Sequence, residues 1–269
     1  MPIKLIATDM DGTFLNSQKD YNRKRFADLY AELKKRDIKF VVASGNQSFQ
    51  LKSFFSDISD ELTFAAENGA HIISKGNDLF AADMPYDAFE KALAILAADH
   101  QGEGIICGTK SAYILETAPE AFYNYTHQYY HRLARVPDLS AMFEKDTIVK
   151  MTFNFPEHLV DEKLAQLTNA LQGVLFPVPT GDGDIDILVP DITKASALAQ
   201  LGKLWNIKPE EMAAFGDGGN DLEMLQFVGH GYAMSNAIPS IQAIADYVIR
   251  SNDEESVLTQ IEKILTAND

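Results

Sequence analysis

Apolar residues recur along the first part of the chain with two alternating patterns, one typical of buried strands and one of amphipathic helices. Ile3–Thr8 (IKLIAT) and Ile38–Ala43 (IKFVVA) have the apolar content of short strands. Between them, Tyr21–Lys35 places four apolar side chains on one helical face, at Phe26, Leu29, Tyr30 and Leu33. Two parallel strands joined by a helix form a βαβ unit, so the pattern predicts a parallel sheet.

The last third of the chain repeats this alternation. The predicted elements are, in order, a helix at Lys194–Trp205, a strand at Met212–Phe215, a helix from Asp221, a strand at Gly231–Met234 and a helix at Asp253–Leu265. Both ends of the chain are therefore expected to contribute to one α/β domain.

The intervening stretch, from about Met84 to Pro190, has a different pattern in which strands and helices do not alternate regularly. It contains strand-like pieces at Ala112–Leu115, Ile148–Phe155, Val174–Val178 and Ile185–Val189, and helical stretches at Tyr86–Ala98, Pro119–Leu133 and Glu157–Leu171. This order predicts an α+β module with antiparallel strands. We assign residues 1–83 and 191–269 to the core domain and residues 84–190 to the inserted domain.

Composition narrows the class of protein. With 46% hydrophobic and 23% charged residues among 269, the chain is predicted to be an ordinary globular protein. Its longest unbroken apolar run, Ala92–Ala98, is far shorter than the ~18 residues that a membrane span needs. We see no signal peptide, because a strand pattern follows Met1 almost at once, and we expect a cytoplasmic location. Cys107 is the only cysteine, which excludes an intramolecular disulfide and fits a reducing compartment.

The net charge of −16 argues against polyanionic partners. Such an acidic surface repels nucleic acid and anionic lipid at long range, so we expect neither as a partner. A small anionic substrate is compatible with this charge only where a metal ion or a few cations reverse the local field.

Two acidic clusters follow predicted strands. Asp9 and Asp11, with Gly12 after them, come directly after the first strand, and Asp217 and Asp221 follow the strand that ends at Phe215. Carboxyl ends of neighbouring parallel strands meet at one edge of the sheet, where carboxylates so close together can share a hard divalent cation. The alternatives are an ordinary Asp-Gly turn for the first cluster and a glycine-rich Asx turn for the second.

Two further positions suit a phosphate group. Ser44 and Gly45 lie between the second strand and a predicted helix, where hydroxyl and backbone N–H groups bind anions. Lys194 lies in the first turn of its helix, where its charge can offset that of the carboxylates. Ser44 can equally cap the helix, and Lys194 can equally be a solvated surface charge.

The order of these motifs resembles that of the haloacid dehalogenase superfamily, and in particular its Cof-type phosphatases, which carry a large α/β cap. Four motifs carry the resemblance over the whole chain: Asp9-Met10-Asp11-Gly12-Thr13, Ser44, Lys194 and Gly216–Asp221. The stretches Asn68-Gly69-Ala70 and Ala233–Ala237 are similar to accessory signatures of the same branch. The resemblance implies a Rossmann-like core with an inserted cap.

The resemblance also implies a role for each matching residue. Asp9 would attack phosphorus as the nucleophile, and Asp11 would serve as general acid and base. Magnesium would be held by Asp9, the backbone carbonyl of Asp11 and Asp217, with Asp221 behind them. The transferring phosphoryl group would be bound by Gly12, Ser44, Gly45, Lys194 and Asn220.

The resulting hypothesis is a magnesium-dependent hydrolase that removes phosphate from small phosphate esters, sugar phosphates above all, through an aspartyl-phosphate. A phosphomutase and a non-catalytic protein that binds a phosphorylated ligand are the alternatives. Asn46 stands where many relatives have arginine, so one cation near the phosphate is missing. We expect a monomer or a weak homo-oligomer.

Two features of the inserted domain remain open at this stage. The loop Thr180–Asp184 can contribute to specificity or can simply be a hairpin turn. His127 and His131 have a metal-ligand spacing on the predicted helix, for which an amphipathic helix with packed aromatic side chains is the simpler interpretation.

Overall fold

The computed structural model describes residues 2–267, and the chain divides into two compact units. The first unit contains the chain up to Gly45, Leu51–Asp78 and the chain from Thr193 onward. The second unit contains Asn46–Gln50 and Leu79–Ile192. Its boundaries fall at 78/79 and 192/193, where the sequence predicts 83/84 and 190/191. The short segment 46–50 is an addition that the sequence analysis does not predict.

Within residues 2–267, the larger sheet has eight strands and belongs to the first unit, except for Leu79–Ala81 at the end of β5. Its strands are β1 (Leu5–Thr8), β2 (Lys39–Ala43), β3 (Thr63–Ala66), β4 (His71–Ser74), β5 (Asn77–Ala81), β12 (Met212–Gly216), β13 (His230–Met234) and β14 (Tyr247–Ile249). They lie in the order β14-β13-β12-β1-β2-β3-β4-β5. All pairs from β14 to β3 are parallel, and β4 is antiparallel to β3.

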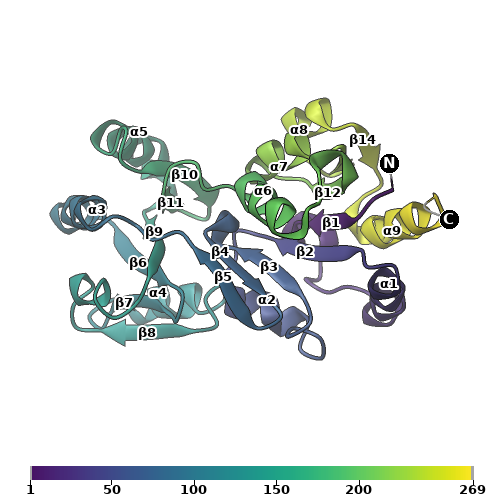
Figure 1. Cartoon of the computed structure of the whole chain (residues 1–269). Coiled ribbons are helices and arrows are strands. Elements are labelled where there is room, and N and C mark those ends of the chain that lie inside the picture. Colours follow the sequence, from purple (N-terminus) through teal and green to yellow (C-terminus); the bar gives the residue numbers. More distant parts are fainter. Residues whose placement is uncertain (1, 268–269) are drawn as a thin grey trace. The chain divides into compact units, whose positions relative to one another are not determined.

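Helices cover both faces of this sheet (Figure 1). They are α1 (Arg23–Lys35), α2 (Ser48–Phe54), α6 (Lys194–Trp205), α7 (Leu222–Phe227), α8 (Pro239–Ile244) and α9 (Ser256–Ala267). Helix α1 packs against α9, whereas α6, α7 and α8 pack in series. The face of α1 that the sequence predicts to be apolar is buried. Right-handed crossovers that run in opposite directions from β1 place the two groups of helices on opposite faces.

The strand order reverses between β1 and β12. From β1 the chain continues through β2 and β3 on one side, and from β12 it continues through β13 and β14 on the other. Residues Leu5–Thr8 pair in register with Met212–Phe215. In open α/β sheets such a reversal leaves a crevice at the carboxyl ends of the strands, which is where ligands bind.

Within the described residues, the second unit has a six-stranded sheet in the order β10-β11-β9-β6-β7-β8. Its strands are β6 (Glu103–Gly108), β7 (Ala112–Leu115), β8 (Leu133–Val136), β9 (Ile148–Asn154), β10 (Phe176–Gly181) and β11 (Asp184–Leu188), and its helices are α3 (Tyr86–Ala98), α4 (Glu120–Thr126) and α5 (Val160–Ala170). Apart from the parallel pair β7–β8, the strand pairs are antiparallel. Side chains of α3, α5 and one sheet face form its hydrophobic core, including Phe89, Met151, Phe153, Leu167 and Ile187.

The predicted fold class, an α/β core with an inserted α+β module, is confirmed. The helix predicted at Pro119–Leu133 is wrong in length, because α4 ends at Thr126. His127 and His131 therefore do not share a helical face, and their spacing has no meaning as a metal site.

The loop around Asp182 is a hairpin turn between β10 and β11, where this residue has a positive φ of 51°. Among the described residues, no helix is long and apolar enough to cross a membrane.

Candidate active site

The centre of the site is an aspartate at the end of the middle strand. Asp9 follows β1, and its N–H donates to the carbonyl of Phe215 in β12 at 3.0 Å, which extends the parallel ladder by one residue. Its side chain is almost fully buried, and Oδ1 accepts a hydrogen bond from Nζ of Lys194 at 2.6 Å. The topology thus places Asp9 at the crevice between β1 and β12.

Lys194 is a buried cation between two carboxylates. Its Nζ also donates to Oδ1 of Asp221 at 2.7 Å, and its side chain has no exposed surface. Thr193 holds the residue at the start of α6 through a capping box with Ser196, in which each side-chain hydroxyl oxygen accepts the backbone N–H of the other residue. The interpretation of Lys194 as a solvated surface charge is therefore wrong.

Asp221 uses both carboxylate oxygens within the protein. Oδ1 bonds Lys194, and Oδ2 accepts the backbone N–H groups of Asp217 and Gly218 at 2.9 and 3.0 Å. Its side chain is completely buried. These bonds fix the loop that carries Asp217, so Asp221 supports the site from behind.

Asp217 lies against two residues of the turn after β1, Gly12 and Thr13. Its Oδ1 accepts a hydrogen bond from the Thr13 hydroxyl at 2.6 Å. Gly12 has a φ of +74°, and a Cβ at this position would lie 2.3 Å from Oδ2 of Asp217. Only glycine therefore allows both this backbone conformation and the close approach of the carboxylate.

The electrostatics of these four groups are unbalanced. Burial raises the pKa of Asp9 well above its ordinary value, and the Lys194 ammonium only partly opposes this. Burial also raises the pKa of Asp217, against the hydrogen bond from Thr13. Burial lowers the pKa of Lys194, but the carboxylates of Asp221 and Asp9 outweigh it, so that this pKa lies above its ordinary range. When all three carboxylates are ionised, they exceed the charge of the one ammonium by two negative charges.

A divalent cation fits this donor set. One carboxylate oxygen from each of Asp9, Asp217 and Asp221 lies within 4.8 Å of the others. All three donors are hard oxygen ligands, which Mg²⁺ and Ca²⁺ prefer, and a double positive charge balances the excess. Because both oxygens of Asp221 are already bonded within the protein, Asp9 and Asp217 are the side chains best placed to contact the ion.

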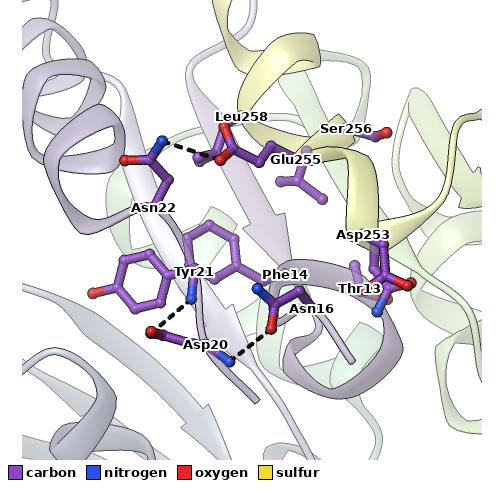
Figure 2. Close-up of a pocket in the computed structure, with 12 residues that line it drawn as sticks. Thr13, Phe14, Asn16, Asp20, Tyr21, Asn22, Asp253, Glu255, Ser256 and Leu258 are labelled. Atoms are coloured by element: carbon purple, nitrogen blue, oxygen red, sulfur yellow. Dashed lines mark hydrogen bonds between the residues drawn. The ribbon is translucent and has the colours of Figure 1, made fainter. Parts of the chain in front are cut away.

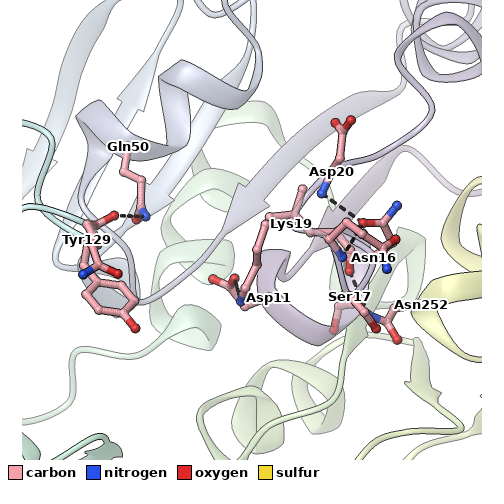
Figure 3. Close-up of polar contacts among 12 residues, drawn as sticks. Asp11, Asn16, Ser17, Lys19, Asp20, Gln50, Tyr129 and Asn252 are labelled. Carbon is pink, nitrogen blue, oxygen red and sulfur yellow. Dashed lines mark hydrogen bonds and ion pairs between the residues drawn. The ribbon is translucent and has the colours of Figure 1, made fainter. Parts of the chain in front are cut away.

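Asp11 lies beside this cluster and is more exposed. Its Oδ1 pairs with Nζ of Lys19 at 2.5 Å, and 40% of its side chain is accessible (Figure 3). Lys19 reaches it from the turn that follows, where this residue has a positive φ of 57°. An accessible carboxyl group next to a buried, charged cluster can exchange protons with a bound molecule and with solvent.

Three of the predicted phosphate-binding residues, Ser44, Gly45 and Asn220, form a second group that follows β2 and β12, whereas Gly12 and Lys194 lie in the carboxylate cluster. The N–H of Ser44 donates to the carbonyl of Ala65, and the Ser44 carbonyl accepts from the N–H of Asn68. The side-chain amide of Asn220 donates to Oδ1 of Asn68 at 3.0 Å. A Cβ on Gly45 would lie 3.2 Å from the same oxygen, so the backbone runs close to Asn68. Asn68 thus links the turn after β2 with the loop that carries Asn220.

A small pocket lies beside the turn Met10–Phe14, on the side of α9 (Figure 2). Thr13 and Phe14 line it together with residues from two loops, including Asn16, Asp20, Asn252 and Asp253. Its polar groups are bonded to one another and to the backbone, as when Asn16 accepts the N–H groups of Gln18 and Asp20. We therefore interpret the residues that line this pocket as structural support for the turn Met10–Phe14.

Sequence reasoning did not include four residues that contact the site. They are Thr13, Lys19, Asn68 and Asn236, whose side-chain amide donates to the carbonyl of Gly12 at 2.8 Å. Thr13, Asn68 and Asn236 lie inside motifs or signatures that the sequence shows, so a signal for them existed. Lys19 lies in a polar turn and carries no such signal.

Known proteins similar to this chain identify its family. The family model of haloacid dehalogenase-like hydrolases matches residues 6–261. The chain is 43% identical over 265 residues to 5-amino-6-(5-phospho-D-ribitylamino)uracil phosphatase YbjI of Escherichia coli (strain K12), covering 98% of this chain and 97% of the relative. It is 25% identical over 287 residues to a phosphatase of the same description, YwtE of Bacillus subtilis (strain 168), covering 98% and 99%.

Among solved structures, SMU.1108c from Streptococcus mutans UA159 superposes with a TM-score of 0.89. Its sequence is 35% identical, and the match covers 98% of this chain and 99% of that one. The likeness therefore extends over both units. The family indicated by the ordered motifs is confirmed, and the chain belongs to the haloacid dehalogenase-like hydrolases.

Proposed function

We propose that this protein is a magnesium-dependent phosphatase of small phosphate esters. The observation that carries the proposal is the Asp9 carboxylate at the carboxyl end of β1, bonded through one oxygen to the buried Lys194. This bond leaves Oδ2 of Asp9 for attack on phosphorus, and a buried ammonium beside the nucleophile favours its ionised form.

Each step of hydrolysis has a residue suited to it. Asp9 attacks phosphorus in line and forms an aspartyl-phosphate, while Asp11 protonates the leaving alcohol. Asp11 then removes a proton from the water that attacks this intermediate, and inorganic phosphate leaves. The exposure of Asp11 supports this double role, because the group must meet both a leaving group and water.

The metal and the phosphate cradle complete the proposal. Asp9, Asp217 and the backbone carbonyl of Asp11 would hold Mg²⁺, and Asp221 would orient the loop of Asp217. When bound, the ion supplies positive charge that offsets the carboxylates and the phosphate. We assign the phosphoryl oxygens to the side chains of Ser44, Lys194 and Asn220 and to backbone N–H groups near Gly12 and Gly45.

The substrate class rests on the relatives. Two of them are named as phosphatases of a ribitylamino-uracil phosphate, in which a sugar-alcohol chain carries the phosphate. We propose that this chain likewise acts on phosphorylated sugars or sugar alcohols, with residues 84–190 as the cap that sets specificity. The net charge of −16 supports a small substrate rather than a nucleic acid. We place this activity in the cytoplasm.

A panel assay tests the proposal. Phosphate release from sugar phosphates, sugar-alcohol phosphates and nucleotides is measured with magnesium and with EDTA, for the wild type, Asp9→Asn and the exposed control Asp87→Asn. We expect release only with magnesium, a loss of at least about 10³-fold in Asp9→Asn and no loss in the control.

The same panel separates the alternatives. Conversion of one sugar phosphate into another without free phosphate would indicate a phosphomutase. Binding of esters without any turnover, by protein that is folded by circular dichroism, would indicate a non-catalytic binding protein. Residual activity of Asp9→Asn near that of the wild type would contradict the assignment of the nucleophile.

A further inference from the structure

The loop that follows β13 lies at the same edge of the sheet as the candidate active site. Strand β13 pairs in parallel with β12, so the chain leaves both strands at their carboxyl ends side by side. The N–H of Ile238, in this loop, donates to the carbonyl of Asp217 at 3.1 Å. The loop of residues 235–238 therefore contacts the backbone of a proposed metal ligand directly.

Asn236 uses both ends of its side-chain amide to join this loop to the turn after β1. Its Nδ2 donates to the carbonyl of Gly12 at 2.8 Å, and its Oδ1 accepts the N–H of Asn252 at 3.1 Å. Asn252 in turn donates through its own Nδ2 to the carbonyl of Leu15 at 2.9 Å. The turn Met10–Phe14 is thus bonded by Asn236 at Gly12 and by Asn252 just beyond its end.

The backbone that carries Asn236 is fixed within the first unit. The N–H of Ala237 donates to the carbonyl of Met234 at 3.0 Å. The side chain of Gln242, in α8, donates through Nε2 to the carbonyl of Ser235 at 3.0 Å and to that of Ala237 at 2.8 Å. Because these carbonyls flank Asn236, its side chain reaches the turn after β1 from a backbone that is already held.

The bond to Gly12 acts on a residue with unusual backbone freedom. Glycine populates many conformations, and this turn needs Gly12 at a φ of +74°. Its carbonyl belongs to the planar peptide group that leads into Thr13, whose hydroxyl donates to Oδ1 of Asp217 at 2.6 Å. Asn236 therefore supports the Asp217 carboxylate through Thr13, while Ile238 supports the Asp217 backbone.

We propose that Asn236 is a positioning residue for the magnesium site, which holds the Gly12 turn and the Asp217 carboxylate in the arrangement that binds the ion. The inference rests on the proposed function in assigning Mg²⁺ to Asp9, Asp217 and the carbonyl of Asp11, and it adds a residue that acts behind these ligands. Without the Asn236 bonds, the turn samples other conformations, and ion binding must first order it. Residues that orient the ligands of a metal typically change its affinity by about 10- to 100-fold.

Two substitutions of this exposed residue test the role. Asn236→Ala removes the amide and its volume, whereas Asn236→Leu keeps the volume and removes only the hydrogen bonds. Asn77→Ala is the matched control, because Asn77 is also exposed and its amide also donates to a backbone carbonyl, that of Lys75, at 3.0 Å. The dissociation constant of Mg²⁺ is measured by calorimetry as magnesium chloride is added to metal-free protein. We expect it to rise about 10-fold in both Asn236 variants and to stay unchanged in the control.

A second measurement separates positioning from a general loss of stability. The rate of phosphate release is followed as a function of magnesium concentration. A merely structural role lowers the fraction of folded protein, and hence kcat, at every magnesium concentration, but leaves the Mg²⁺ dissociation constant of the folded fraction unchanged. Positioning raises the magnesium concentration for half-maximal rate about 10-fold and leaves kcat at saturating magnesium within about 2-fold of the wild type. Wild-type dissociation constants in both Asn236 variants would overturn the inference.

The outcomes for the two proposals are distinct. If the wild type binds Mg²⁺ but hydrolyses no ester, the phosphatase proposal fails, whereas weaker binding in the Asn236 variants still supports this inference. If the wild type binds no Mg²⁺ at all, the metal assignment is wrong and this inference fails with it. If esters are hydrolysed with magnesium and the Asn236 variants bind the ion normally, only this inference fails.

Discussion

Gly12 allows the close approach between the turn after β1 and Asp217. Replacing it with alanine has two effects, a steric collision with the Asp217 carboxylate and backbone strain at a positive φ, which a control variant can separate. A Cβ at position 12 would lie 2.3 Å from Oδ2 of Asp217, so the carboxylate has to move by about 1 Å before the contact is ordinary. Alanine at a φ of +74° also adds strain, of about 1 kcal/mol after the loss of unfolded-state entropy is counted.

Gly76 is a matched control for this substitution. It has the same φ of +74°, and the nearest atom to a Cβ there is Oδ1 of Asp60 at 3.6 Å, an ordinary contact. Gly76→Ala therefore carries the backbone strain without a collision. We expect both variants to lose about 1 kcal/mol in free energy of unfolding through this strain.

The two variants should differ in catalysis. A displacement of about 1 Å in a group that orients the reacting atoms can cost about 100-fold. We expect Gly12→Ala to lose about 100-fold in kcat/KM for phosphate release and to need more magnesium for half-maximal rate, with Gly76→Ala close to the wild type. Equal kcat/KM values for the two variants at saturating magnesium would refute the steric argument.

Two other predictions follow from buried charges. Lys194→Met leaves Asp9 and Asp221 without their cation, so we expect a loss of about 3–5 kcal/mol in urea unfolding without metal. A loss below about 1 kcal/mol would contradict the pairing. Burial raises the pKa of Asp184 to about 6, so this group holds a proton in the folded state that it releases on unfolding. Its contribution to the free energy of unfolding falls by about 2–3 kcal/mol as pH rises from about 4 to 6, and parallel pH profiles for the wild type and Asp184→Asn would exclude this.

The sequence predicts the bounds of an element best where a long periodic pattern of apolar residues ends at a recognisable capping residue. Helix α6 has the predicted bounds because Thr193 provides a cap and apolar residues repeat along one face. Six strands were not predicted: β3, β4, β5, β6, β8 and β14. For β3, β4 and β5, the turns between them interrupt the pattern. Residues 119–133 have helical composition only in part, and the chain leaves the helix at Thr126 to reach β8.

The candidate site was predictable in outline, because strand order brings the ends of β1 and β12 together. The sequence shows that Asp9, Asp217 and Lys194 follow or precede such elements, but it does not show which carboxylate oxygen is already bonded. Only the structure shows that both carboxylate oxygens of Asp221 accept hydrogen bonds within the protein, which is why Asp221 supports the site from behind.

The position of β1 in the middle of its sheet has a consequence for biosynthesis. Its neighbour β12 lies about 200 residues later in the chain, which a ribosome takes roughly 10–40 s to produce. The second unit is almost continuous in sequence, so its strands can pair while β1 still has only β2 beside it. Asp9 is thus made about 200 residues before Lys194 and Asp217. A growing chain that has not yet reached Lys194 and Asp217 lacks both the cation and the second carboxylate, so the metal-binding centre can form only after both have been made.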